Sequence, residues 1–216
     1  MRDLKGVIVV AANPVDLMTL IAARTAGLPA GRVIGTGTLL DTSRLRQLLA
    51  SRLGVAPASV EGDVLGEHGD SEVAAFSTVR IGGLALEQFD EAGRTTAHAE
   101  LAEDVRQAGY RIVAGKGFTS FGVATATVRI CEAILRDEKV VLPVSVMLTG
   151  QYGVSNIFLS LPCILGAAGA ERILAPDLTA AEQAALLASA DTLKKALATL
   201  ELSASEGSSP LHAPNT

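Results

Sequence analysis

Hydrophobic positions near the N-terminus follow a strand pattern, then a helix pattern, then a strand pattern again. Residues 6–12, Gly-Val-Ile-Val-Val-Ala-Ala, form a continuous and mostly β-branched run, which is typical of a central parallel strand buried on both faces. Asn13 and Pro14 then provide an expected N-cap and first-turn proline for a helix. Residues 32–35 form a second strand-like run, so residues 6–37 predict one β-α-β unit with a right-handed crossover.

The pattern after this unit predicts helices and antiparallel strands, with no second β-α-β repeat. A single unit of this kind cannot form a doubly wound sheet by itself, so it is expected to be the severed edge of a larger one. The other expected elements are a helix from Asp41 to Gly54, a hairpin over residues 73–86, helices over about 95–113 and 120–136, strands over 140–149 and 153–165, and a last helix after Thr179.

The last helix has the clearest start and the clearest apolar face. Thr179 and Glu182 have the spacing of a capping box. Apolar residues then recur every three or four positions as one stripe, made of Leu186, Ala190, Leu193, Leu197 and Leu200. Residues 204–216 are rich in Ser and poor in apolar side chains, and we expect them to form a disordered tail.

Composition and charge exclude several classes of partner. The chain carries 18 Lys and Arg against 23 Asp and Glu, a formal net charge of −5, with no basic run that would bind nucleic acid. No apolar run approaches the roughly 20 residues that span a bilayer, so no membrane segment is predicted. Cys131 and Cys163 lie in apolar segments without C-x-x-C spacing, which predicts reduced thiols in a cytoplasmic protein without a metal site.

Three short segments combine reactive side chains with turn residues: 13–16, 41–44 and 66–70. Asn13 follows the first strand, and open α/β sheets bind ligands in the crevice outside the carboxyl ends of their strands. Its side chain is therefore expected to reach a substrate. Arg44 lies three residues beyond Asp41, so both are expected to project from the first turn of one helix into the same space.

His68 is the histidine best placed for acid–base chemistry, because it lies in a Gly-flanked loop beside apolar segments. Hydride transfer to a 2-oxo acid needs a proton donor at the carbonyl oxygen, and an imidazole backed by a carboxylate can serve near neutral pH. Asp41 is the candidate carboxylate, and the planar guanidinium of Arg44 suits a substrate carboxylate. The alternatives are a structural histidine, a solvated helix charge for Arg44, and helix caps for Asp41 and Asn13.

Several of these segments resemble successive signatures of the lactate/malate dehydrogenase family, in family order and spacing. They are Asn-Pro-Val-Asp at 13–16, Val-Ile-Gly-Thr-Gly-Thr at 33–38, Leu-Asp-Thr-Ser-Arg-Leu-Arg at 40–46 and Val-Leu-Gly-Glu-His-Gly-Asp-Ser at 64–71. Shorter matches continue at 116–120, 143–145, 152–154, 161–166 and 189–193. The resemblance therefore covers about residues 6–200.

The resemblance implies a role for each matching residue. His68 is the implied acid/base, Asp41 orients it, and Arg44 grips the carboxylate of a small 2-oxo or 2-hydroxy acid. The implied contacts are Asn13, Asp16, Arg44 and Thr119 for the substrate, and Ala11, Ala12, Asn13 and Thr36 for the nicotinamide half of the cofactor NAD.

The resemblance also implies that part of the NAD-binding domain is missing. No Gly-x-Gly-x-x-Gly fingerprint occurs in the sequence, and in the family the segment that carries it precedes the strand of residues 6–12. A truncated gene or a mis-assigned start at Met1 is therefore expected. The chain is interpreted as α/β, with a β-α-β remnant of a doubly wound Rossmann sheet over 1–37, an α+β catalytic domain over 38–203 and the tail over 204–216.

Within the family, the sequence favours lactate over malate. Gly-Glu-His-Gly-Asp-Ser at 66–71 is similar to lactate dehydrogenases, whereas malate enzymes commonly have Gly-Gly-His-Gly-Asp. The alternatives are a malate or other 2-hydroxy-acid dehydrogenase and an inactive remnant that acts as an interaction module.

The family implies a homo-oligomer, dimer or tetramer, when complete. For the fructose 1,6-bisphosphate site of bacterial members, Arg46 fits, but Asp63 stands where a histidine is expected.

Overall fold

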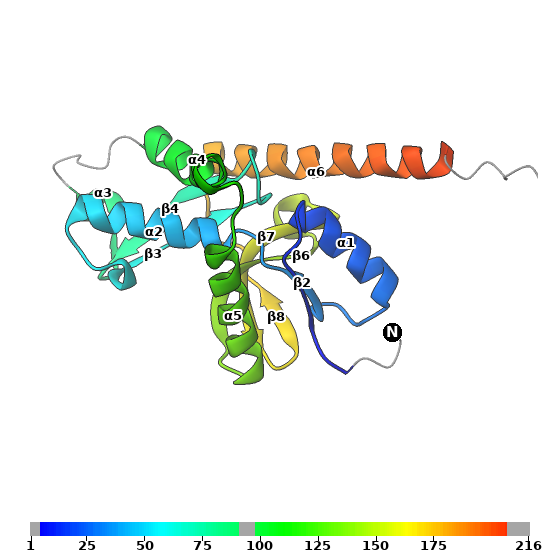
Figure 1. The fold of residues 1–216 in the computed structure, drawn as a ribbon. Helices are drawn as coiled ribbons and strands as arrows, with labels where there is room; N and C mark the ends of the chain where they lie inside the picture. The colour runs from blue at the N-terminus through cyan, green and yellow to red at the C-terminus, as the bar shows by residue number, and fades with distance from the viewer. Residues whose placement is uncertain (1–4, 91–97, 207–216) are drawn as a thin grey trace, which may run out of the picture.

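Two β-sheets and six α-helices make up the part of the chain that this computed structural model describes, residues 5–90 and 98–206 (Figure 1). The larger sheet has the order β1-β2-β6-β7-β8 and contains β1 (Ile8–Val10), β2 (Val33–Gly35), β6 (Val140–Thr149), β7 (Ser155–Gly166) and β8 (Gly169–Ile173). The smaller sheet has the order β3-β4-β5 and contains β3 (Val60–Leu65), β4 (Val73–Ile81) and β5 (Leu84–Ala85). The helices are α1 (Val15–Ala26), α2 (Leu39–Leu53), α3 (Leu86–Phe89), α4 (His98–Lys116), α5 (Phe121–Leu135) and α6 (Ala180–Glu206).

The first β-α-β unit forms as the sequence predicts. β1 and β2 pair in parallel with Val9 opposite Ile34, and α1 connects them and ends at Gly27 in the left-handed conformation. The expected central position of β1 is wrong. β2 is its only neighbour among the described strands and its residues are half-buried, because one β-α-β unit supplies only one partner strand.

The start of α1 also differs from the expectation. The N-cap position is held by Pro14, and no side chain caps the helix. Asn13 therefore does not act as the helix cap, which leaves its amide available for other contacts.

The β-α-β unit joins the rest of the chain through an antiparallel pairing of β2 with β6, where Gly35 faces Ser145. The turn after β2 lies tightly against the β6–β7 hairpin at Gly37. A Cβ atom there would lie 2.6 Å from the amide nitrogen of Ser145 and 2.5 Å from the hydroxyl of Ser160, and its φ is +52°. Glycine is thus required at this position. The domain boundary after residue 37 stays a prediction, since β2 and the turn both contact the same hairpin.

α2 begins two residues earlier than the sequence predicts. The carbonyl of Thr38 accepts the amide of Thr42 at 2.8 Å, so helical hydrogen bonding starts before Asp41. Asp41 is therefore not a helix cap and lies inside the first turn. The predicted end holds, because Gly54 adopts the left-handed conformation with a φ of 70°.

The long helices and strands agree with the sequence patterns to within a few residues. The capping box of α6 is confirmed, because Thr179 accepts the amide of Glu182 at 3.3 Å and the Glu182 carboxylate accepts the amide of Thr179 at 2.9 Å. α6 continues to Glu206, so the residues at 204–206 are helical and not tail. The remainder of the predicted tail, 207–216, lies outside the described residues.

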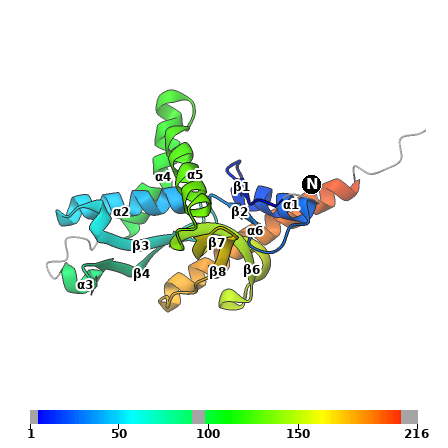
Figure 2. The ribbon, with the colours of Figure 1, turned by 90° about the horizontal axis from the view of Figure 1, so that it is seen from below.

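The buried apolar side chains form two separate clusters. One core lies around the β6–β7 hairpin and receives side chains from α1, α5 and α6, and the other lies between α2, α4 and the β3–β4 pair. Seen from below, α4 and α5 project away from the sheets (Figure 2). None of the described helices combines the length and the apolar character that a membrane crossing requires.

Candidate active site

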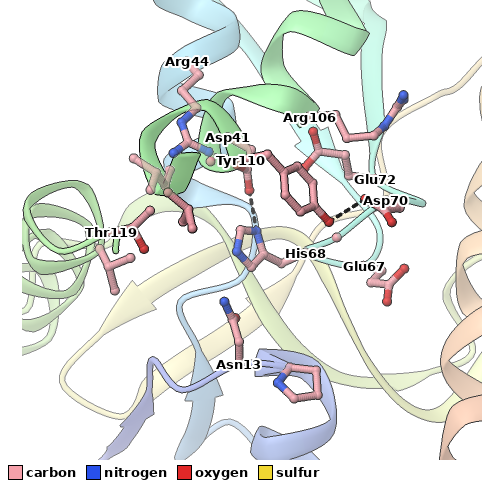
Figure 3. A pocket seen from close by; sticks show the side chains of 16 residues that line it. Asn13, Asp41, Arg44, Glu67, His68, Asp70, Glu72, Arg106, Tyr110 and Thr119 are labelled. Atoms are coloured by element: carbon pink, nitrogen blue, oxygen red, sulfur yellow. Dashed lines mark hydrogen bonds and ion pairs between the residues drawn. The ribbon is translucent and has the colours of Figure 1, made fainter. Parts of the chain in front are cut away.

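A cavity of about 580 Å³ opens where the start of α1, the start of α2, the loop before β4 and helices α4 and α5 meet (Figure 3). Its walls come from segments that are far apart in sequence. The lining residues that carry the argument below are Asn13, Asp41, Arg44, His68, Glu72, Arg106, Tyr110 and Thr119.

His68, Asp41 and Arg44 converge on this cavity. The Nδ1 atom of His68 lies 2.6 Å from Oδ2 of Asp41, and Nη1 of Arg44 donates to Oδ1 of the same carboxylate at 2.8 Å. The Asp41 side chain is only 3% exposed and that of Arg44 only 19%. Arg44 is therefore not a solvated helix charge, and the predicted convergence of the three residues is confirmed.

The surroundings of His68 favour its protonated form. Burial alone lowers the pKa of an imidazole, but the hydrogen bond to Asp41 and the negative charge of that carboxylate raise it. The charges of Asp16 and Glu72 raise it further, so the pKa of His68 lies above its usual value. An imidazole of this kind can hold a proton near neutral pH and release it to a developing oxyanion.

Asp16 lies beneath the His68 loop and outside the cavity, which differs from its predicted contact with substrate. Its side chain is buried, Oδ2 accepts the backbone amide of His68 at 2.9 Å, and Oδ1 accepts the hydroxyl of Ser145 at 2.5 Å. Burial raises the pKa of Asp16 to about 6. Asp16 supports the backbone that carries the imidazole, and burial of this kind is not visible in the sequence.

The loop that carries His68 is anchored at its start to two distant elements. Gly66 and Ser160 of β7 exchange backbone hydrogen bonds of 3.0 and 2.9 Å. The amide of Glu67 donates to the hydroxyl of Ser189 on α6 at 2.8 Å. These contacts fix the position of the imidazole relative to the larger sheet.

The other predicted contacts divide into two groups. Asn13 and Thr119 line the cavity, and the Asn13 amide points toward His68 (Figure 3). Ala11 and Ala12 are exposed at the end of β1, Thr36 is buried, and none of the three lines the cavity. Their contact with a cofactor stays a prediction.

Several lining residues were not among the predicted site residues, and three of them bear on the chemistry of the cavity. Tyr110 of α4 donates to Oδ1 of Asp70 at 2.9 Å across the cavity mouth, and Arg106 lies one helical turn earlier. Helical spacing places Arg106 and Tyr110 on one face of α4, but the sequence does not show what that face covers. Glu72 follows the His68 motif directly, and only its burial marks it as part of the site.

Asp41, His68 and Glu72 bring their nitrogen and oxygen donors within 4.8 Å of one another, which is the spread of a small metal site. Both oxygens of Asp41 are already engaged, one with His68 and one with Arg44. The arrangement therefore fits a network of ion pairs and hydrogen bonds better than it fits a metal site.

The residues at the suspected effector position form a pair with each other. Nη2 of Arg46 lies 3.1 Å from Oδ1 of Asp63, and Nε of Arg46 donates to the carbonyl of Gly62 at 2.9 Å. Because Asp63 neutralises the guanidinium, this position is poorly suited to hold a sugar bisphosphate.

Comparisons with known proteins agree with this geometry. The family model for the lactate/malate dehydrogenase α/β C-terminal domain matches residues 38–202. L-lactate dehydrogenase of Thermus aquaticus is 48% identical over 200 residues, and that of Limosilactobacillus reuteri is 43% identical over 192 residues. The crystal structure of the minor L-lactate dehydrogenase from Enterococcus mundtii in its ligands-bound form superposes with a TM-score of 0.87 at 43% identity.

The matches cover most of this chain but only part of each relative. The alignments span 91% of the chain for the Thermus protein, 88% for the Limosilactobacillus protein and 91% for the Enterococcus structure. The same alignments span 64%, 59% and 63% of the relatives' own lengths. The chain thus spans less than two thirds of the length of these relatives.

Proposed function

The chain belongs to the lactate/malate dehydrogenase family, and we propose that it is the substrate-handling part of an NAD-dependent L-lactate dehydrogenase. One observation carries this proposal: Nδ1 of His68 lies 2.6 Å from a carboxylate that also holds Arg44 at the same cavity. The relatives reported above are named L-lactate dehydrogenases, which favours lactate and pyruvate over malate and oxaloacetate.

In the direction of pyruvate reduction, His68 is the general acid. Its Nδ1 is held by Asp41, which leaves Nε2 as the nitrogen that faces the carbonyl oxygen of the substrate. As the carbonyl carbon is reduced, the proton on Nε2 moves to that oxygen, and Asp41 stabilises the imidazole in the required orientation. In the direction of lactate oxidation the neutral imidazole takes this proton back.

Arg44 binds the substrate carboxylate in this proposal. Its planar guanidinium can form two parallel hydrogen bonds with a carboxylate, which fixes the substrate relative to His68. One of its nitrogens bonds Asp41 in the present structure, so one edge of the guanidinium is held in place while another meets the substrate. Asn13 also lines the cavity, and in this proposal its amide donates to the substrate carbonyl.

NAD supplies or accepts the hydride when it is bound. In this proposal its nicotinamide half contacts Ala11 and Ala12, which are small and exposed at the end of β1, and Asn13, which lines the cavity. The glycine fingerprint that would hold the pyrophosphate does not occur in this sequence. We therefore propose that the 216-residue chain alone binds NADH weakly and is inactive.

The proposal is tested with a chimera in which residues 6–200 replace the matching segment of the Thermus aquaticus enzyme. We expect this chimera to reduce pyruvate with NADH, and the His68→Asn substitution to lower kcat by at least about 100-fold. Asp191→Asn on α6 serves as the control that leaves kcat unchanged. Activity that does not depend on His68 would overturn the assignment. A chimera that binds NADH without turnover would favour the inactive interaction module.

We further propose that the complete protein is a homo-oligomer, dimer or tetramer. Phe121, Val128 and Leu135 stand seven residues apart on α5, so they share one face of that helix, and they are 79%, 57% and 84% exposed. An exposed apolar stripe on a helix is typical of a subunit interface.

A cytoplasmic location remains a prediction that agrees with two free cysteines.

A further inference from the structure

Glu72 is a buried acidic residue beside the proposed acid–base pair. It precedes β4, lines the cavity and is only 8% exposed. Its Oε1 atom is buried and has no hydrogen-bond partner in the described part of the chain. A buried carboxylate oxygen without a partner is costly when the group is charged, and protonation of the carboxyl removes most of that cost.

The nearby carboxylate of Asp41 makes the ionisation of Glu72 still less favourable. Its carboxyl oxygen lies within 4.8 Å of ligand atoms of Asp41 and His68. Arg44 donates to Asp41, and one nitrogen of Arg106 donates to Glu103. Both guanidinium charges favour the ionised form of Glu72, but they only partly offset the effects of burial and of Asp41. Two carboxylates this close repel each other in a partly buried site, so only one of them ionises readily.

We propose that Glu72 is a positioning residue that controls when His68 gives up its proton. While Glu72 is protonated, Asp41 is the principal anion beside the imidazole, and His68 can cycle between its acid and base forms. Once Glu72 ionises, a second anion stands beside the imidazole and His68 retains its proton. The role of this control in catalysis rests on the proposed function. The coupling between the protonation of Glu72 and that of His68 does not, because it follows from the positions of the two side chains.

Burial, followed by the charge of Asp41, raises the pKa of Glu72 to about 8, and the charges of His68, Arg106 and Arg44 partly offset this rise. Glu72 therefore loses its proton in the mildly alkaline range. The other ionisable groups near the imidazole are Asp16, which accepts the His68 amide, and Glu67, Asp70 and Tyr110, which line the same cavity.

The test follows the imidazole signals by NMR in the 216-residue chain, which has only three histidines. The His68→Asn variant identifies the Hε1 signal of His68. We expect this signal to titrate in two steps in the wild-type chain. In Glu72→Gln we expect one step, with its midpoint at lower pH, because the second anion can no longer form. The control Glu87→Gln, at an exposed position on α3, should leave both steps in place.

A wild-type curve identical to that of Glu72→Gln would overturn the proposal. Unchanged titration of His98 in the variant shows that its fold is intact. Should the variant fail to fold, the carboxyl carbons of ¹³C-labelled Glu in the wild-type chain decide the matter. One of them titrating in the mildly alkaline range supports the proposal, and all of them titrating near the ordinary value for Glu contradicts it. Neither measurement depends on dehydrogenase activity.

Discussion

At the scale of single residues, Asp41 divides its two oxygens between His68 and Arg44. Replacing it with asparagine removes the negative charge and keeps the shape. We predict that Asp41→Asn lowers the pKa of His68, because the hydrogen bond to this carboxylate and the negative charge of the carboxylate raise that pKa most. NMR titration of the His68 imidazole measures the change, and Asp191→Asn on α6 is the exposed control. An unchanged His68 titration would contradict the pairing.

Asp16 predicts a specific dependence of stability on pH. Its pKa is raised from 3.8 to about 6 by burial, so between these values the folded chain binds one proton more than the unfolded chain. The stabilisation is complete below about pH 4 and is lost as the pH rises through 6. Two pKa units correspond to about 3 kcal/mol.

The Asp16→Asn variant removes this titration. We expect the difference in free energy of unfolding between wild type and variant to change by about 3 kcal/mol between pH 4 and pH 7, with the wild type losing stability as the pH rises. Urea unfolding at several pH values measures it. Parallel pH profiles of the two proteins would show that Asp16 does not bind the extra proton.

The sequence predicts only those site residues whose type and spacing suggest chemistry. His68, Asp41 and Arg44 belong to this group, because an imidazole, a carboxylate and a guanidinium have complementary roles. Asp16 was assigned to the substrate because residues 13–16 match a family signature. Its burial and its hydrogen bond to Ser145, which lies 129 residues further along the chain, are not visible in the sequence. Glu72 was missed for the same reason, since its significance arises from what surrounds it in the fold.

At the scale of elements, the sequence pattern predicts the long helices and the mostly apolar strands, but not the strands that contain several polar residues. β3 was missed because charged residues and a glycine occupy three of its six positions, with Gly62 at an inward-facing position where an apolar side chain would mark the strand. β8 was missed because only five residues form it and they include charged ones. β1 was predicted, but its position at a sheet edge could not be, because neighbours are set by pairing and not by the strand's own sequence.

The capping box of α6 gives a prediction at this scale. Thr179→Ala removes the hydroxyl that accepts the Glu182 amide, and we expect the free energy of unfolding to fall by about 1 kcal/mol. Thr192→Ala is the matched control, since that exposed threonine only donates to a carbonyl within the same helix. Urea unfolding compares the two variants, and an equal loss in both would argue against the cap.

At the scale of the whole molecule, the exposed stripe on α5 predicts self-association. Replacing Phe121 and Leu135 together with serine is expected to shift the chain toward monomer, because it removes two large apolar side chains from the proposed interface. Sedimentation at several concentrations measures the change. Leu84→Ser, at an exposed apolar position on β5, should have no effect. A wild-type chain that remains monomeric at high concentration would contradict the interface.

α6 anchors the His68 loop through Ser189, although the two contacting residues are 122 positions apart and α6 does not line the cavity. A change of side chain at Ser189 would alter the stiffness of the loop while leaving every group in the cavity chemically the same. In the proposed dehydrogenase, this helix therefore offers a site distant from the cavity at which the rate and temperature dependence of turnover can be changed separately from substrate preference.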